Sequence, residues 1–129
     1  MNKSKEKPAP PPIPSHILAW RELEALVERQ KQGELEPEIF VSELSNVLRR
    51  YIERRFDLRA PELTTEEFLN LLTKDAGELK SQQSVLKQFL EFTDLVKFAD
   101  QKVKDEDVEK GFEFIKTFIQ QSKMEVGHS

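Results

Sequence analysis

Hydrophobic residues recur at helical spacing along five segments of the chain, and residues that start or stop helices bound most of these segments. The first segment runs from Ser15, a candidate N-cap, to about Gln32, where Gly33 follows as a stop. The second begins at Pro37, which suits the first turn of a helix, and ends near Phe56. The apolar face of this second helix comprises Phe40, Leu44, Val47, Leu48, Tyr51 and Ile52.

A break and a new helix start follow the second segment. Ala60-Pro61 interrupts the chain, because the residue before a proline is pushed out of the helical conformation. The third helix is predicted to open on a capping box formed by Thr64 and Glu67. The threonine oxygen accepts from the amide of Glu67, whose carboxylate reaches back to the cap residue. Asp75-Ala76-Gly77 is predicted to end this helix.

The remaining pattern predicts two more helices. The fourth starts near Ser81, and Thr93-Asp94 is predicted to interrupt it before a short apolar turn, Leu95–Ala99, that packs on the bundle. The fifth covers about residues 105–123, with Val108, Phe112, Ile115 and Ile119 as one apolar stripe. No window shows the alternation of a β-strand. The sequence therefore predicts an all-α fold, a single bundle of about five helices.

The two ends of the chain differ from this helical part. Residues 1–14 hold five of the seven prolines, among them the PxxP pair Pro8 and Pro11. Such a segment favours extended conformations and has little to bury, so we expect a disordered proline-rich linker. We expect the helical bundle domain to span residues 15–124, and residues 125–129 to form a disordered C-terminus.

Charge and composition narrow the function classes. The formal net charge is −4, and the first fourteen residues carry three lysines against one glutamate, so the remainder is more acidic than the whole. An acidic body disfavours broad binding to a phosphate backbone. The chain has no cysteine, which excludes disulfides and thiolate metal sites. No apolar run is long enough to span a bilayer.

Residues capable of catalysis are not grouped in any familiar pattern. His16 and His128 lie at opposite ends of the chain, and the four glycines are scattered rather than gathered in a phosphate-binding loop. Serines such as Ser42 and Ser45 have no nearby histidine to act as a base. We therefore expect no catalytic site, no cofactor and no bound metal, and a protein that is not an enzyme.

A run of arginines forms the candidate interaction surface, namely Arg49, Arg50, Arg54 and Arg59. Glu53 and Asp57 are interleaved with them, and Arg49 and Glu53 are spaced as an i,i+4 ion pair. Three interpretations stay open for this run: a solvated, ion-paired helix face, a protein-binding surface, or a nucleic-acid-binding surface.

Arg55 differs from the other arginines because it falls near the middle of the apolar arc of its helix. A guanidinium there must either reach water past the helix end or find a carboxylate. Asp94 is the first choice of partner, since it interrupts an apolar run, and Glu67 is the second. We expect such a pair to serve the structure rather than catalysis.

Two stretches of the sequence resemble a known family: LRRYIERRFDLRAPELTTEEFL at residues 48–69 and FLEFTDLVKFAD at residues 89–100. They are similar to the cytoplasmic helical domain of a family of bacterial membrane proteins that has no agreed biochemical activity. Relatives are encoded near Bat (aerotolerance) proteins, MoxR-type ATPases and von Willebrand A-domain proteins. The resemblance covers about Leu35 to Phe118. Its markers are Arg50-Tyr51, Ala60-Pro61, the helix start Thr64–Phe68, and Asp94–Ala99.

The resemblance implies a membrane-spanning helix before the proline-rich linker, with the bundle on the cytoplasmic side of the bacterial inner membrane. The three lysines of the first fourteen residues suit that side. The expected function is a non-catalytic protein-interaction module of a membrane-anchored protein, serving envelope or stress-related assembly through a protein partner. The alternative is a freestanding nucleic-acid-associated regulator that uses the Arg49–Arg59 face.

Overall fold

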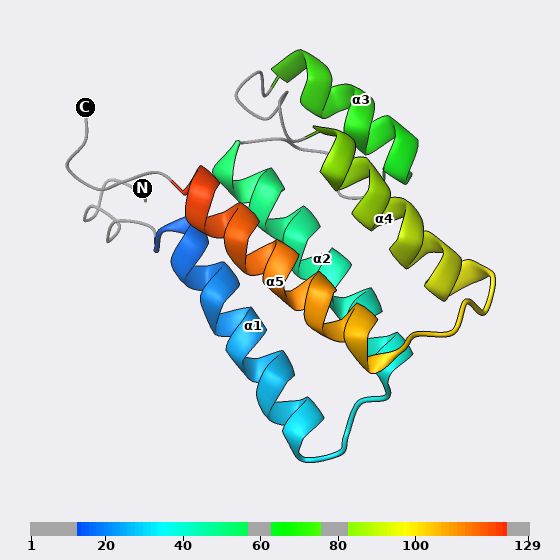
Figure 1. Cartoon of the computed structure of the whole chain (residues 1–129). Coiled ribbons are helices and arrows are strands. Elements are labelled where there is room, and N and C mark those ends of the chain that lie inside the picture. The colour runs from blue at the N-terminus through cyan, green and yellow to red at the C-terminus, as the bar shows by residue number, and fades with distance from the viewer. Residues whose placement is uncertain (1–12, 57–62, 76–82, 124–129) are drawn as a thin grey trace, which may run out of the picture.

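The computed structural model describes residues 13–56, 63–75 and 83–123, the side chains of 71–75 excepted. These residues form five helices and no strand, arranged as one bundle (Figure 1). The helices are α1 (Ser15–Lys31), α2 (Pro37–Arg55), α3 (Thr65–Asp75), α4 (Gln83–Phe98) and α5 (Asp105–Ser122). The predicted all-α bundle is confirmed. Ala60-Pro61, Arg59 and the predicted C-terminal segment 125–129 lie outside the described residues, as does most of the predicted linker.

Backbone hydrogen bonds and one glycine conformation define both ends of α1. The N-cap of α1 is Pro14 rather than Ser15, because the Pro14 carbonyl accepts from the amides of Ile17 and Leu18. At the other end Gly33 has a φ of 75°, a conformation that glycine adopts without steric cost. The amides of Gly33 and Glu34 close that end on the carbonyls of Gln30 and Arg29, which is a Schellman motif.

Helix α2 is the centre of the bundle. In Figure 1 it lies behind α5, with α1 and α4 on either side, and it packs against all three. Helix α3 packs on α4. The fully buried large side chains are Leu23, Phe40, Leu44, Leu48, Tyr51, Ile52, Phe68, Leu86, Leu90, Ile115 and Phe118. Every helix contributes to this core, so the bundle has one hydrophobic centre.

Helix α4 is continuous through Phe98, so the predicted interruption at Thr93-Asp94 is wrong. The Thr93 hydroxyl is buried and donates to the carbonyl of Leu90, within the same helix. A threonine can satisfy its hydroxyl in this way without breaking the helix. The apolar turn expected at Leu95–Ala99 is therefore mostly the last turn of α4, and only Val96 of its large apolar residues is buried.

The start of α3 confirms the predicted capping box. The amide of Glu67 donates to Thr64 Oγ1 at 3.1 Å, and the amide of Thr64 donates to a carboxylate oxygen of Glu67 at 3.0 Å. The Thr64 carbonyl also accepts from the amide of Phe68. Two otherwise unpaired amides are satisfied, and α3 begins at Thr65.

Replacing Thr64 with alanine is expected to lower the free energy of unfolding by about 1 kcal/mol, because the amide of Glu67 loses its acceptor. Urea denaturation followed by circular dichroism measures the change. Thr117 is exposed within α5, so Thr117→Ala is the matched control and should cost nothing measurable. Equal effects of the two substitutions would contradict a capping role for Thr64.

None of the helices in the described part of the chain combines the length and the apolar character needed to cross a membrane.

Candidate interaction site

Arg49 joins the middle of the bundle to the start of α3. Its Nη2 donates to Thr65 Oγ1 at 2.8 Å, and its Nη1 donates to the carbonyl of Leu63 at 3.2 Å. The guanidinium carbon lies 4.9 Å from the centre of the Phe68 ring, within cation–π range. Arg49 is therefore a half-buried polar anchor between α2 and α3, and not a member of a solvated face.

The start of α3 and the end of α4 meet around Arg49. A cavity of about 410 Å³ lies between α2, the start of α3 and the end of α4. It is lined by Asn46, Arg49, Leu63, Thr64, Thr65, Asp94, Lys97 and Phe98. The helix start Thr64–Phe68 and the segment Asp94–Ala99 are far apart in sequence but share this cavity. We call this cavity, together with the exposed α4 residues Lys97 and Phe98 that border it, the junction site.

Positive charge in the junction site is incompletely neutralised. Burial lowers the pKa of Arg49, although Asp94 and Glu53 act in the opposite direction. Partial burial also lowers the pKa of Lys97, and Arg49 lowers it further, while Asp94 and Glu43 raise it. Among the described residues no carboxylate lies within ion-pair distance of Arg49 or Lys97. The expected ion pair of Arg49 with Glu53 is absent, and Glu53 affects the pKa of Arg49 only from beyond ion-pair distance.

Replacing Arg49 with methionine is expected to raise the pKa of Lys97 toward its ordinary value, because one repelling charge leaves the junction site. An NMR titration of the Lys97 side-chain carbon signals measures this shift. Arg29 pairs with Glu34 at the far end of α1, so Arg29→Met is the charge-matched control. A Lys97 pKa that stays the same in Arg49→Met, or rises equally in Arg29→Met, would refute the coupling.

The end of α4 exposes apolar side chains beside these charges. Phe98 is 81% exposed and Leu95 is 50% exposed, whereas Val96 is buried on the inner side of the helix. This corrects the expectation that Leu95 and Phe98 pack on the bundle. An exposed phenylalanine ring beside partly desolvated cations is an arrangement suited to binding another surface.

The other predicted arginines bind different helices. Arg50 and Arg54 both pair with Glu22 of α1, at 3.2 and 3.1 Å. One carboxylate therefore ties two successive turns of α2 to α1. Since Arg49 turns toward α3 instead, the described arginines of the run do not share one surface. Glu22 was not anticipated as their partner.

Arg55 does not pair with Asp94. Its Nε donates to the backbone carbonyl of Ser122 at 2.7 Å, and its guanidinium lies 4.5 Å from the centre of the Phe56 ring. Asp94 belongs to the junction site with Arg49, and Glu67, the second choice of partner, caps α3. Arg55 is the last residue of α2 and reaches the C-terminal end of α5, where carbonyls carry partial negative charge.

Ser122 receives a second bond from α2. The hydroxyls of Tyr51 and Ser122 lie 2.9 Å apart and are buried. The Ser122 hydroxyl also donates to the carbonyl of Phe118 at 2.7 Å. Tyr51 and Arg55 therefore hold the end of α5 at two points of the same residue.

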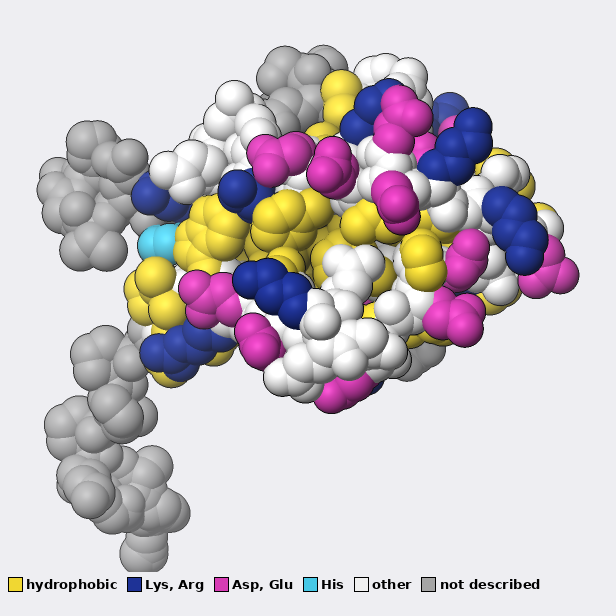
Figure 2. Space-filling view, turned by 60° about the horizontal axis from the view of Figure 1, so that its bottom comes forward, with side chains coloured by type: hydrophobic (Ala, Val, Ile, Leu, Met, Phe, Trp, Pro, Cys, Tyr) yellow, Lys and Arg dark blue, Asp and Glu magenta, His cyan; other side chains and the backbone are white. Residues whose placement is uncertain are grey.

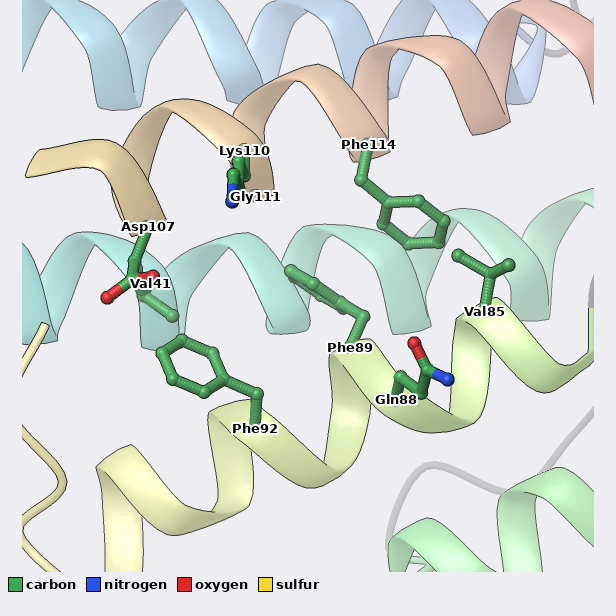
Figure 3. A pocket seen from close by; sticks show the side chains of 9 residues that line it. All are labelled: Val41, Val85, Gln88, Phe89, Phe92, Asp107, Lys110, Gly111 and Phe114. Atoms are coloured by element: carbon green, nitrogen blue, oxygen red, sulfur yellow. The ribbon is translucent and has the colours of Figure 1, made fainter. Parts of the chain in front are cut away.

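A second hollow lies between α4 and α5. Figure 3 shows Phe89 and Phe92 of α4 and Phe114 of α5 directed into it, with Val41 of α2 beneath. Its volume is about 380 Å³. A Cβ added at Gly111 would lie 3.3 Å from a methyl carbon of Leu44, so glycine allows α5 to approach α2 closely here. We interpret this aromatic hollow as an extension of the core.

The face of the molecule shown in Figure 2 carries both acidic and basic side chains. Hydrophobic side chains form a strip across its middle, and acidic and basic side chains border the strip on both sides. In the described part of the chain, no group of three His, Cys, Asp or Glu residues is placed to hold a metal ion.

No protein-family model, curated protein or solved structure matches this chain.

Proposed function

We propose that this chain is a non-catalytic protein-interaction module whose partner binds the junction site. The observation that carries the proposal is the 81% exposure of Phe98 at the end of α4. Covering an exposed apolar ring with another protein surface removes the ring from water and lowers the free energy of the complex. Aromatic residues and arginine are also the side chains enriched where protein partners meet.

The charges around Phe98 support recognition of one orientation of a partner. Lys97 and Asp94 lie at the same end of α4, and Arg49 is held beneath them by its bonds to α3. Charges of both signs at the border of an apolar contact favour a partner whose charges are complementary and disfavour one that places like charges opposite them. Because α2 and α4 are continuous helices packed on the core, binding requires little reorganisation of these groups.

The family resemblance adds the cellular setting to this proposal. The module would sit on the cytoplasmic side of a bacterial inner membrane, attached through an upstream helix, and would serve envelope or stress-related assembly. The nucleic-acid alternative required a shared basic face, and the described arginines point to different helices. We therefore propose no second function.

Site-specific photo-crosslinking in a host extract tests the proposal. A photoreactive residue at position 98 should yield an adduct with one defined protein. The same residue at Gln120, which is exposed on α5, should not yield that adduct. Lys97→Glu should reduce the position-98 adduct by reversing one charge of the site. Absence of an adduct at position 98, or identical adducts at both positions, would overturn the proposal.

A further inference from the structure

The cavity of the junction site has two cations and one carboxylate among its described lining residues. Arg49 belongs to α2, whereas Asp94 and Lys97 belong to α4 and lie about one helical turn apart. Asp94 acts on both cations, because its charge opposes the lowering of the pKa of each. Glu53 acts on Arg49 alone and Glu43 on Lys97 alone, and neither lines the cavity. One carboxylate at the cavity is therefore shared between two cations.

Arg49 is held in a fixed orientation at this cavity. Its guanidinium has five N–H groups, of which one donates to the Leu63 carbonyl and another to the Thr65 hydroxyl. The Phe68 ring lies 4.9 Å from the guanidinium carbon. Among the described residues, the other N–H groups of Arg49 have no acceptor. A carboxylate is the acceptor that matches a guanidinium best, because its two oxygens accept parallel hydrogen bonds.

Lys97 reaches the same cavity from the solvent side. Its side chain lies at the exposed end of α4. No carboxylate of the described residues lies within ion-pair distance of its ammonium. The ammonium and the guanidinium of Arg49 repel each other, which contributes to the lowered pKa of Lys97. A second carboxylate close to both cations relieves this repulsion.

Exposed apolar side chains border the two cations. Phe98 directly follows Lys97 in the sequence and is 81% exposed, and Leu95 is 50% exposed. Leu95 and Asp94 precede Phe98 by three and four positions, so both lie on its side of α4. A residue that covers Phe98 consequently brings its own neighbour close to Lys97.

We propose, building on the function proposed above, that the partner of the junction site presents an acidic side chain next to a large apolar one. The apolar side chain covers Phe98, and the carboxylate enters the cavity between Arg49 and Lys97. The cavity of about 410 Å³ has room for a carboxylate side chain. Attraction to two cations outweighs repulsion from the single charge of Asp94, whereas a basic side chain meets the opposite balance.

Selection from a displayed library of random peptides tests the chemistry of the partner. Peptides that bind the whole chain but not the Phe98→Ala variant are ligands of the junction site. These peptides should be enriched in Asp or Glu next to a large apolar residue. Phe98-dependent peptides without such enrichment would overturn the inference. Absence of any Phe98-dependent peptide would also overturn it, and the crosslinking at position 98 decides separately on the proposed function.

Charge variants test the sign of the interaction with one selected peptide and its amide isostere, in which Glu is replaced by Gln or Asp by Asn. Lys97→Gln should weaken binding of the acidic peptide by about two- to fivefold, the range of one partly exposed charge contact, and leave the amide peptide unaffected. Asp94→Asn should strengthen binding of the acidic peptide, because a competing carboxylate is removed. Weaker binding in Asp94→Asn would overturn the inference.

A second lysine separates the site from general charge. Lys102 is exposed in the loop between α4 and α5, so Lys102→Gln makes the same change of net charge as Lys97→Gln. It should leave the affinity for the acidic peptide unchanged. Equal weakening by both variants would overturn the inference, because the effect would then follow net charge alone.

Sequencing of the adduct formed at position 98 in a host extract extends the test to the natural partner. The crosslinked segment of the partner should contain Asp or Glu beside a large apolar residue. An adduct whose crosslinked segment has no acidic residue would overturn the inference and leave the proposed function in place.

Discussion

Replacing Phe68 with alanine is expected to lower the free energy of unfolding by about 3–5 kcal/mol. Phe68 is fully buried and supplies the aromatic surface of α3 to the core. Its ring also lies against the guanidinium of Arg49. Truncation therefore removes a large apolar contact and opens a cavity where α3 meets the bundle. Urea denaturation monitored by circular dichroism measures the loss.

Phe98 provides a matched control for this prediction. The same truncation, Phe98→Ala, removes a ring that is already 81% exposed. It should change the free energy of unfolding by less than about 0.5 kcal/mol, as is usual for surface positions. If Phe98→Ala proved as destabilising as Phe68→Ala, the end of α4 would be part of the core and the proposed binding surface would fail.

Replacing Arg49 with methionine is expected to lower the free energy of unfolding by about 1–3 kcal/mol. The substitution keeps an apolar stem but leaves the carbonyl of Leu63 and the hydroxyl of Thr65 without their donor. Because both acceptors are partly buried, water replaces the guanidinium only incompletely. The same denaturation experiment measures the effect.

Arg29→Met serves as the control for Arg49→Met. Arg29 forms an exposed ion pair with Glu34, in which both side chains are about half exposed. Exposed pairs contribute little, so this substitution should cost less than about 1 kcal/mol. A larger loss for Arg29 than for Arg49 would show that Arg49 is not a structural anchor.

Local sequence signals predicted the helices well because their causes are local. Pro37 begins α2, and Thr64 with Glu67 caps α3, since each effect acts within one turn of backbone. The centre of the α2 apolar face was also recognisable from its spacing. Five helices and the all-α class follow from such signals without knowledge of which helices touch.

The partners of the arginines could not be predicted in the same way. Arg49 lies about 100° around α2 from Leu48, at the edge of the apolar arc, and Arg55 lies near its middle. These angles describe one helix and do not identify its neighbours. In the bundle α3 covers the edge beside Arg49, whereas the end of α5 covers Arg55. Both arginines thus anchor α2 to a neighbouring helix, Arg49 to α3 and Arg55 to α5, whereas the carboxylate partner expected for Arg55, Asp94, lies beside Arg49.

The end of α4 was misjudged for a related reason. Thr93 and Asp94 interrupt an apolar run in the sequence, which resembles a helix boundary. In the structure Thr93 bonds within its own helix, and Asp94 faces the junction site. Thr93 lies on the same buried face as Leu90 and Val96, so the polar pair does not mark an end of the helix. Lys97 and Phe98 lie within Leu95–Ala99, but the apolar character of that stretch predicted packing on the bundle rather than an exposed helix end.

The two bonds that α2 makes to Ser122 have a consequence for helix alignment. The hydrophobic contacts between α2 and α5 are not directional in themselves, and their setting depends on close packing such as that at Gly111. Tyr51 and Arg55 bond the hydroxyl and the carbonyl of one residue, at fixed distances. A displacement of α5 by a single residue, about 1.5 Å along its axis, would strain or break these bonds. This polar pair therefore adds a directional restraint on the longitudinal setting of α5 to the restraint that the packed apolar surfaces supply.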